Sequence, residues 1–438
     1  MLGIIGLLLG GAFIIAGIYR GWGLPVVMIV GSIIVVLTNG IPLTDAFATM
    51  FEGLGTMARI FMPLYLFSCM VATLYIDSGA GISLGEACLK LFAKHASPKQ
   101  QRVVAIVVIL LVGALICWSV DAFLLHAAIA ICLMAITNIP RKYVVTFVML
   151  SSTIAMCIPG HMNLNTLLDN FLPGSHMSGF WAAVVGVVFV FLASVIVISR
   201  SVEKDLAKGE KFEYGSLQPS DPAQAADRPH PVAGLIPLVL MVVLYLVVGI
   251  EAWIVLAIGA AVSFLLFAKS LCKIHGKGPV AVLKQSIDSG IHMASMPIIM
   301  LFNSTFGYAV GMTPAVGVIA NSFLGLAVHP LVAYTLMSTV VIGLCNSSAG
   351  PVTCALIAQQ YFANLVDPGA LRLITIYAGT VLDSLPTNLC IVATAAWAGV
   401  TIKESYPTVF KTTVIVTAVA LVIVTTMLVL FPGLAAGI

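Results

Sequence analysis

The chain has 438 residues, of which 61% are hydrophobic and only 8% are charged, whereas soluble proteins carry roughly 25% charged residues. So few charges cannot cover a water-exposed surface, and most of the surface is therefore expected to face lipid. The formal net charge of +3 argues against a nucleic-acid partner. The nine cysteines occur singly, without the spacing of a disulfide framework or a metal site, so we expect no metal and no cofactor.

Apolar stretches that are long enough to cross a bilayer recur along the chain. The first lacks a basic segment before it and a small-residue cleavage signal after it, which indicates a retained span. An amphipathic segment at 79–95 is typical of a helix that lies in the membrane interface. We predict an all-α integral membrane protein of about ten transmembrane helices, at 1–18, 24–39, 57–76, 141–158, 179–199, 231–249, 250–268, 293–311, 370–385 and 408–432.

Two longer apolar stretches, 101–138 and 328–366, are each broken in the middle by polar residues. Non-helical backbone at membrane depth is tolerated only where it is buried in protein or lines a cavity. The breaks at 119–121 and 346–350 therefore predict two re-entrant hairpins whose tips are buried. Paired full crossings joined by an ordinary loop explain the same stretches, and the sequence does not distinguish the two.

The segment 200–230 is rich in charged residues and proline, which is the composition of a flexible linker. On its two sides the pattern of apolar runs and polar breaks repeats, with 117–121 in register with 344–348 and 158–161 with 385–388. Repeats with matching breaks are a sequence pointer to a transporter binding site. We predict two inverted-topology repeats, 1–199 and 231–438, joined by this linker.

The distribution of basic residues gives the orientation. With an odd number of crossings in each half, Arg59 and Arg372 lie on one side and the other eighteen of the twenty Lys and Arg lie on the side of the linker. The positive-inside rule makes the linker side cytoplasmic. We therefore expect a multi-pass protein of the cell (inner) membrane with both termini outside and 200–230 in the cytoplasm.

Two short motifs resemble the gluconate permease (GntP) family. The sequence Leu-Asp-Ser-Leu-Pro-Thr-Asn at 382–388 is similar to that family's Leu-Asp-(Ser/Thr)-Leu-Pro-His-Asn, and Thr-Ile-Lys-Glu-Ser-Tyr at 401–406 is similar to its Thr-x-His-Lys-Glu-(Ser/Ala)-Tyr. Two departures are clear, because Thr387 stands where a histidine is usual and the second motif lacks its histidine. The resemblance to this family, within the ion transporter superfamily, implies proton- or sodium-coupled uptake of small carboxylates by a homodimer, and the departures leave the substrate and the coupling ion open.

A carboxylate that crosses the membrane must exchange its water shell for hydrogen-bond donors. Helix breaks near the middle of the membrane supply such donors as unpaired backbone N–H groups at helix N-termini. The alternative is that the small polar residues only cap helices or permit close helix packing. The predicted substrate-binding residues lie in four breaks and are Ser119, Gly160, His161, Asn163, Asn346, Ser347, Ser348, Gly350, Thr387 and Asn388.

Ionisable residues inside the membrane are costly and mark functional sites by default. Asp121, at the first predicted hairpin tip, and Asp383, before the second proline break, are the predicted proton-coupling residues. Asp121 is alternatively the N-cap of a helix that begins at Ala122. We expect His126 to be structural, and Arg372 either to attract anions near the outer mouth or to snorkel to the interface.

The sequence predicts a symporter that imports a small organic anion by alternating access with proton coupling. No Lys or Arg stands in the breaks to pair with a second carboxylate, which favours a hydroxy-monocarboxylate or a sugar acid such as gluconate. A sodium-coupled dicarboxylate or citrate carrier is the alternative. An enzyme is disfavoured because no motif places a nucleophile beside its base or metal ligands at helical spacing, and a channel is disfavoured because polarity is confined to short breaks.

Overall fold

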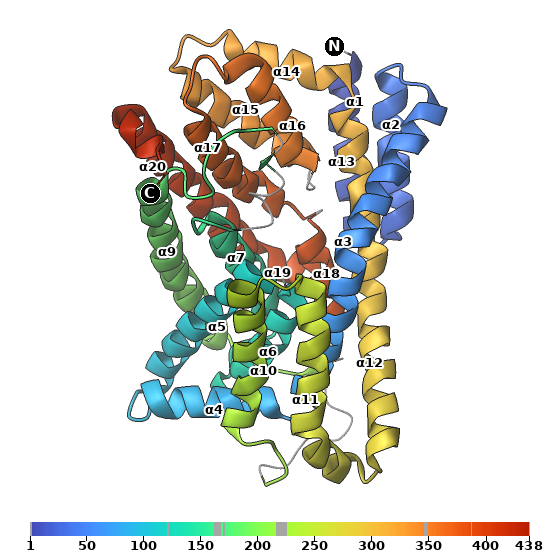
Figure 1. The fold of residues 1–438 in the computed structure, drawn as a ribbon, viewed down its shortest axis with the longest axis vertical. Coiled ribbons are helices and arrows are strands. Elements are labelled where there is room, and N and C mark those ends of the chain that lie inside the picture. Colours follow the sequence, from blue (N-terminus) through green and yellow to red (C-terminus); the bar gives the residue numbers. More distant parts are fainter. Residues whose placement is uncertain are drawn as a thin grey trace.

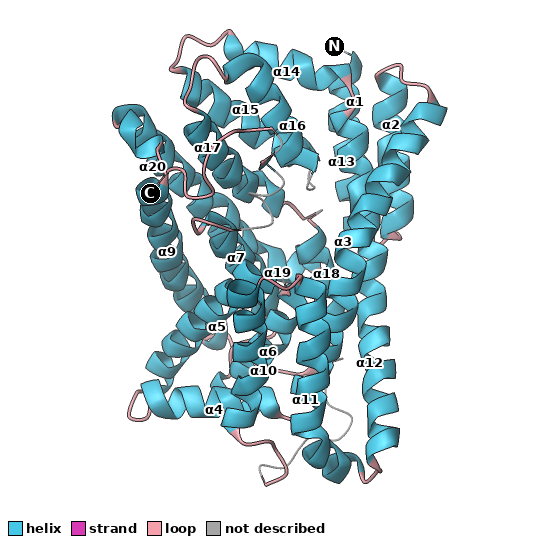
Figure 2. Cartoon of the chain, viewed as in Figure 1, coloured by secondary structure: helices cyan, strands magenta, loops and turns pink. Residues whose placement is uncertain are grey.

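The structure is a computed structural model that describes residues 2–120, 122–161, 168–169, 171–215, 226–345, 349–386 and 388–437. Its secondary structure over these residues is entirely helical (Figure 2). This agrees with the predicted all-α fold, because a helix satisfies every backbone hydrogen bond within one segment and lipid offers no other partner. The residues before the linker form α1 (Leu2–Tyr19), α2 (Leu24–Thr38), α3 (Leu43–Asp77), α4 (Ala80–Phe92), α5 (Pro98–Val120), α6 (Phe123–Thr137), α7 (Tyr143–Cys157) and α9 (Phe180–Leu206).

The second half begins directly after the linker with a proline at the first helical position, where its missing N–H costs no hydrogen bond. Short π-helical turns at Leu244–Val248, Ala358–Phe362 and Phe410–Ile415 interrupt its apolar stretches. Its helices are α10 (Pro231–Val243), α11 (Ala252–His275), α12 (Pro279–Ile299), α13 (Asn303–Gly311), α14 (Pro314–Leu324), α15 (Pro330–Cys345), α16 (Ala349–Ile357), α17 (Pro368–Val381), α18 (Leu389–Ala398), α19 (Ile402–Val409) and α20 (Val416–Leu430).

Helices that could cross a membrane occur in both halves of the chain. Among the described residues, seven are long and apolar enough by length and composition: 2–19, 43–77, 98–118, 180–206, 252–275, 279–311 and 402–430. Further apolar helices, including α2, α6, α7, α10 and α15, are shorter. The chain is therefore a multi-pass membrane protein, while the predicted number of about ten crossings stays a prediction.

Several helices extend beyond the predicted spans. Helix α3 has 35 residues, which corresponds to about 52 Å at 1.5 Å per residue and exceeds a hydrocarbon core of roughly 30 Å. The predicted span 57–76 lies within α3, whose first turns also carry Asp45 and Glu52, two charges that lower the local hydropathy without stopping the helix. Helix α12 likewise begins at Pro279, well before the predicted start at 293.

The long helices set the frame of the molecule (Figure 1). Helix α3 packs against α11 and α12, and α13 packs against α2 and α3, so that these helices line one side along the long axis. In the view of Figure 1, α5 and α6 lie in the lower part, whereas α15 and α16 lie in the upper part. Helix α4, the predicted interfacial segment, lies across the lower end.

The two predicted hairpins are pairs of contacting helices. Helix α5 packs against α6, and α15 packs against α16. Helix α6 is buried along nearly its whole length, as is expected of a helix that is apolar on all sides. Its 15 residues span only about 22 Å. The structure thus surrounds this arm with protein, and the distinction between a re-entrant hairpin and paired crossings stays a prediction.

The segment predicted as a flexible linker is partly structured. Helix α9 continues to Leu206, so that the first residues of 200–230 are helical. Lys142, before α7, donates hydrogen bonds to Glu210 and forms ion pairs with Asp205 at 2.8 Å and with Glu210 at 2.7 Å. Arg102 on α5 pairs with Glu203 at 2.6 Å. The charged composition that predicts flexibility therefore serves to dock the start of this segment on α5 and on the turn between α6 and α7.

Lys142→Gln is expected to loosen this docked segment. The substitution removes two ion pairs whose side chains are partly buried, with a cost of about 1 kcal/mol. Amide hydrogen exchange in 203–214 should accelerate severalfold. Lys208→Gln is the matched control, because Lys208 is 59% exposed in its pair with Asp205. Equal acceleration in both variants would contradict a specific role for Lys142.

Candidate functional site

The first proline break lies against the end of α5. Helix α7 ends at Cys157, and Gly160 adopts a φ of +81°, a left-handed conformation that favours glycine. His161 follows and is 3% exposed. Its ring forms a hydrogen bond with the backbone of Cys117, in the last turns of α5. The structure therefore brings the first break and the end of α5 together.

The second break shows the corresponding arrangement. After α17 the chain makes a 3-10 turn, Leu382–Ser384, and the Tyr406 hydroxyl donates to the Ser384 carbonyl at 3.1 Å. Helix α15 packs tightly on this turn, because a Cβ added at Gly343 would lie 2.6 Å from the Cβ of Leu382. The second break is therefore also next to the end of a helix of a contacting pair, here α15.

Asp383 and Asn388 form a polar pair inside the second break. The Asn388 side chain accepts hydrogen bonds from the backbone N–H groups of Cys390, at 2.7 Å, and Ile391, and so caps the N-terminus of α18. Its amide nitrogen donates to the Asp383 carboxylate at 2.9 Å. Asp383 is partly buried and Asn388 is 6% exposed. An ionisable carboxyl group inside a membrane protein is costly and marks a candidate functional site.

The two broken helices pack against each other. Helix α7 contacts both α17 and α18, and the Cys157 thiol lies 3.9 Å from the Thr380 hydroxyl. These residues directly precede the two breaks, at Ile158–Pro159 and Leu382–Asp383. Helix ends from opposite halves of the chain therefore meet within one buried region.

Many of the predicted site residues cannot be placed. Asp121, Asn163, Asn346, Ser347, Ser348 and Thr387 lie outside the described residues. The backbone of Ser119 ends α5. Gly350 lies in the first turn of α16, where an added Cβ would be 3.0 Å from the Ile342 Cα, which is a close approach of the two arms. His126 contacts the Ile109 carbonyl through Nε2 at 3.1 Å and is fully buried.

An ion-paired cluster around Arg372 was not predicted. The Arg372 side chain is 1% exposed, so it does not snorkel to the interface. It donates to the Leu172 carbonyl at 2.9 Å and to the Asp169 carboxylate at 2.5 Å. His176 contacts the same carboxylate at 2.9 Å. Nothing in a single sequence pairs residues that lie about 200 positions apart, although the isolated arginine in an apolar stretch was the available signal.

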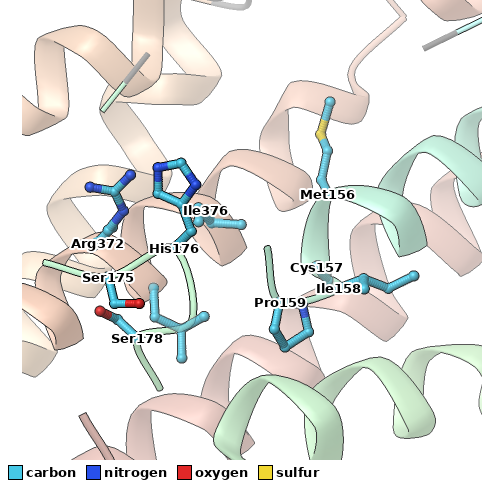
Figure 3. A pocket seen from close by; sticks show the side chains of 10 residues that line it. Met156, Cys157, Ile158, Pro159, Ser175, His176, Ser178, Arg372 and Ile376 are labelled. Carbon is cyan, nitrogen blue, oxygen red and sulfur yellow. The ribbon is translucent and has the colours of Figure 1, made fainter. Parts of the chain in front are cut away.

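A small pocket joins this cluster to the first break (Figure 3). Its cavity volume is about 10 Å³. Burial opposes ionisation of Asp169, but the hydrogen bonds from His176 and Arg372 outweigh this effect and lower the pKa of Asp169. The pocket thus combines a buried cation and hydroxyl groups beside an interrupted helix, and it is lined by Met156, Cys157, Ile158, Pro159, Ser175, His176, Ser178, Arg372, Leu373 and Ile376.

A second, largely apolar pocket borders the second break. Its cavity volume is about 260 Å³. Helices α1, α2 and α13 form most of its wall, and Gly343, Leu344 and Leu385 form the side next to the break. Its lining offers few polar groups, so it does not extend the polar site.

Comparison with known proteins gives one relative in sequence. No protein-family model matches the chain. The chain is 22% identical over 448 residues to a Bacillus subtilis (strain 168) protein described as "uncharacterized transporter YxjC", covering 89% of this chain and 91% of that protein. Among solved structures it resembles the YdaH transporter of Alcanivorax borkumensis with a TM-score of 0.37 and 14% identity, over 89% of each chain. The similarity in sequence thus extends over nearly the whole chain and is to a protein described as a transporter.

Proposed function

We propose that the protein is a secondary transporter that carries small organic anions across the membrane by alternating access. The observation that carries the proposal is the packing of the broken helix α7–Pro159 against the broken helix α17–Asp383. Each break adjoins the end of a hairpin arm, at Cys117 and at Gly343. Interrupted helices are tolerated in a membrane where they line a cavity or a site. The relative described as a transporter supports the same class of function.

The order of the helices supports two inverted repeats. In each half a helix pair leads to a long helix, then to a shorter helix (α4 or α14), a pair of contacting helices and a helix that ends in a proline break, with α13, α18 and α19 as additional short helices of the second half. Figure 1 places the first contacting pair in the lower part and the second in the upper part, as an inverted repeat requires. Together with the positive-inside rule, this arrangement supports the proposal that both termini are outside and the linker is cytoplasmic.

The substrate class follows from the charges near the breaks. Arg372 is a buried cation that lines the pocket beside Pro159 together with Ser175 and Ser178, and Asn388 lies in the second break. One cation and several neutral donors suit a monocarboxylate that also carries hydroxyl groups, such as gluconate or another sugar acid. Asp383 is the proposed proton carrier. A sodium-coupled dicarboxylate or citrate carrier is the second candidate.

Uptake by purified protein in liposomes tests these assignments. Radiolabelled gluconate, lactate, succinate and citrate are offered with a pH gradient or a sodium gradient imposed separately. We expect accumulation of a hydroxy-monocarboxylate under the pH gradient, and collapse of that gradient by a protonophore should abolish it. Accumulation of succinate or citrate that requires only the sodium gradient would favour the second candidate. The absence of uptake for the whole panel would contradict carboxylate transport.

A further inference from the structure

Arg372 and Asp169 form an ion pair in which the cation is buried and the anion is exposed to solvent. The Arg372 side chain is 1% exposed, whereas the Asp169 side chain is 43% exposed. A buried charge is costly without a partner, so Arg372 requires an anion beside it. Asp169 has no such requirement, because its carboxylate reaches water and also contacts His176 at 2.9 Å and 3.0 Å.

The surroundings of the pair are suited to an organic acid. Arg372 shares its pocket with Ser175, His176 and Ser178, and the opposite wall is formed by Ile158 and Pro159 (Figure 3). The cavity volume of about 10 Å³ is room for about one water molecule and is far below the roughly 300–1,000 Å³ of common ligand pockets. A ligand would therefore have to replace the Asp169 carboxylate, because there is little room beside it.

We propose that Arg372 is the access site at which the carboxylate of the transported anion exchanges with the Asp169 carboxylate. This inference rests on the proposed transport of organic anions and names the first contact of the substrate with the protein. The exchange replaces one carboxylate by another, so the buried guanidinium stays paired throughout. The displaced Asp169 keeps His176 and water as partners. The incoming anion is then next to the break at Pro159.

If the Arg372–Asp169 pair is purely structural, Asp169→Asn should change transport in the opposite direction. If Asp169 only holds the loop 168–178 on α17, then Asp169→Asn weakens the loop and lowers transport. If Asp169 competes with the substrate, the same substitution removes the competitor and strengthens substrate binding. Removal of the competing carboxylate should lower the KM for a carboxylate about tenfold, which corresponds to about 1.4 kcal/mol.

The first experiment measures uptake by liposomes that contain wild type, Asp169→Asn, Arg372→Gln or the double variant, with gluconate and lactate as probes. We expect a lower KM for Asp169→Asn and a higher KM for Arg372→Gln. The Asp169→Asn effect should vanish in the Arg372→Gln background, because the competition needs the guanidinium. Arg59→Gln, which removes an exposed arginine of α3, should leave the KM unchanged.

The second experiment detects binding without transport. Ser175 is an exposed residue that lines the pocket. The half-exposed Cys88, Cys272 and Cys390 are first replaced by Ser. Ser175→Cys in this background is then labelled with a membrane-impermeant thiol reagent. Gluconate or lactate should slow labelling, more strongly with Asp169→Asn, and sorbitol should not. Arg372→Lys keeps the charge if Arg372→Gln fails to fold, and should weaken protection because Lys lacks the planar fork.

The outcomes separate this inference from the proposed function. Protection of Ser175→Cys by a carboxylate without uptake would support the access site and contradict transport. Uptake without protection, or an unchanged or raised KM in Asp169→Asn, would overturn the access site and leave transport standing. The absence of both uptake and protection would contradict both.

Discussion

Asp383→Asn is expected to abolish accumulation driven by a pH gradient while exchange of substrate across the membrane continues. Asparagine has the shape of aspartate and still accepts the hydrogen bond that Asn388 donates at 2.9 Å, so the break should keep its geometry. The asparagine side chain cannot bind and release a proton, however. A gradient of one pH unit acting on one coupled proton is worth about 1.4 kcal/mol, or tenfold accumulation. The variant should therefore only equilibrate its substrate in the liposome assay, where wild type concentrates it.

The controls for this prediction separate coupling from folding. Asp288→Asn, which neutralises an exposed carboxylate of α12, should accumulate substrate like wild type. Counterflow exchange in Asp383→Asn shows that the substrate site is intact. Full proton-driven accumulation in both Asp383→Asn and Asp121→Asn would contradict coupling through these two carboxylates.

The sequence was sufficient for most helices because lipid imposes simple requirements on the chain. An apolar stretch in a bilayer has to be helical, and so the predicted spans at 1–18, 24–39 and 250–268 correspond to α1, α2 and α11. Helix ends were predicted less well, because a charged residue lowers the local hydropathy and ends the predicted span, whereas the helix itself continues past that residue. Helix α9 runs through Glu203 and Lys204 to Leu206 for this reason. The short helices α14 and α18 were not predicted.

The sequence predicted only those features of the candidate site that depend on residues close together in the chain. Proline and clustered polar residues predicted the breaks at Pro159 and Asp383, and the structure confirms that the helices end there. Contacts between residues far apart in the chain could not be predicted from the sequence. The hydrogen bond of His161 with Cys117 and the pair of Arg372 with Asp169 join segments that are far apart. Their partners are set by tertiary packing.

Gly113→Ala is expected to destabilise the first contacting pair strongly, although it adds only one methyl group. The added Cβ would lie 2.2 Å from Nε2 of His126 and 2.5 Å from the Ser151 hydroxyl. Both side chains are fully buried, on α6 and α7. Overpacking costs roughly 1–3 kcal/mol, and loss of the His126 contact with Ile109 adds about 1–3 kcal/mol. The sum is a large part of a typical stability of about 5–15 kcal/mol.

The measurement is thermal unfolding of the purified variants, followed by size-exclusion chromatography. Gly55→Ala is the matched control, because Gly55 lies inside α3 with nothing within 4 Å of an added Cβ, and alanine there should be neutral or stabilise by up to about 1 kcal/mol. His126→Ala should rescue part of the stability of Gly113→Ala by giving the methyl group room. Full stability of Gly113→Ala alone would show that α5 is not held this closely against α6 and α7. The first arm would then be free to separate from its neighbours, as an ordinary pair of crossings allows and a buried hairpin does not.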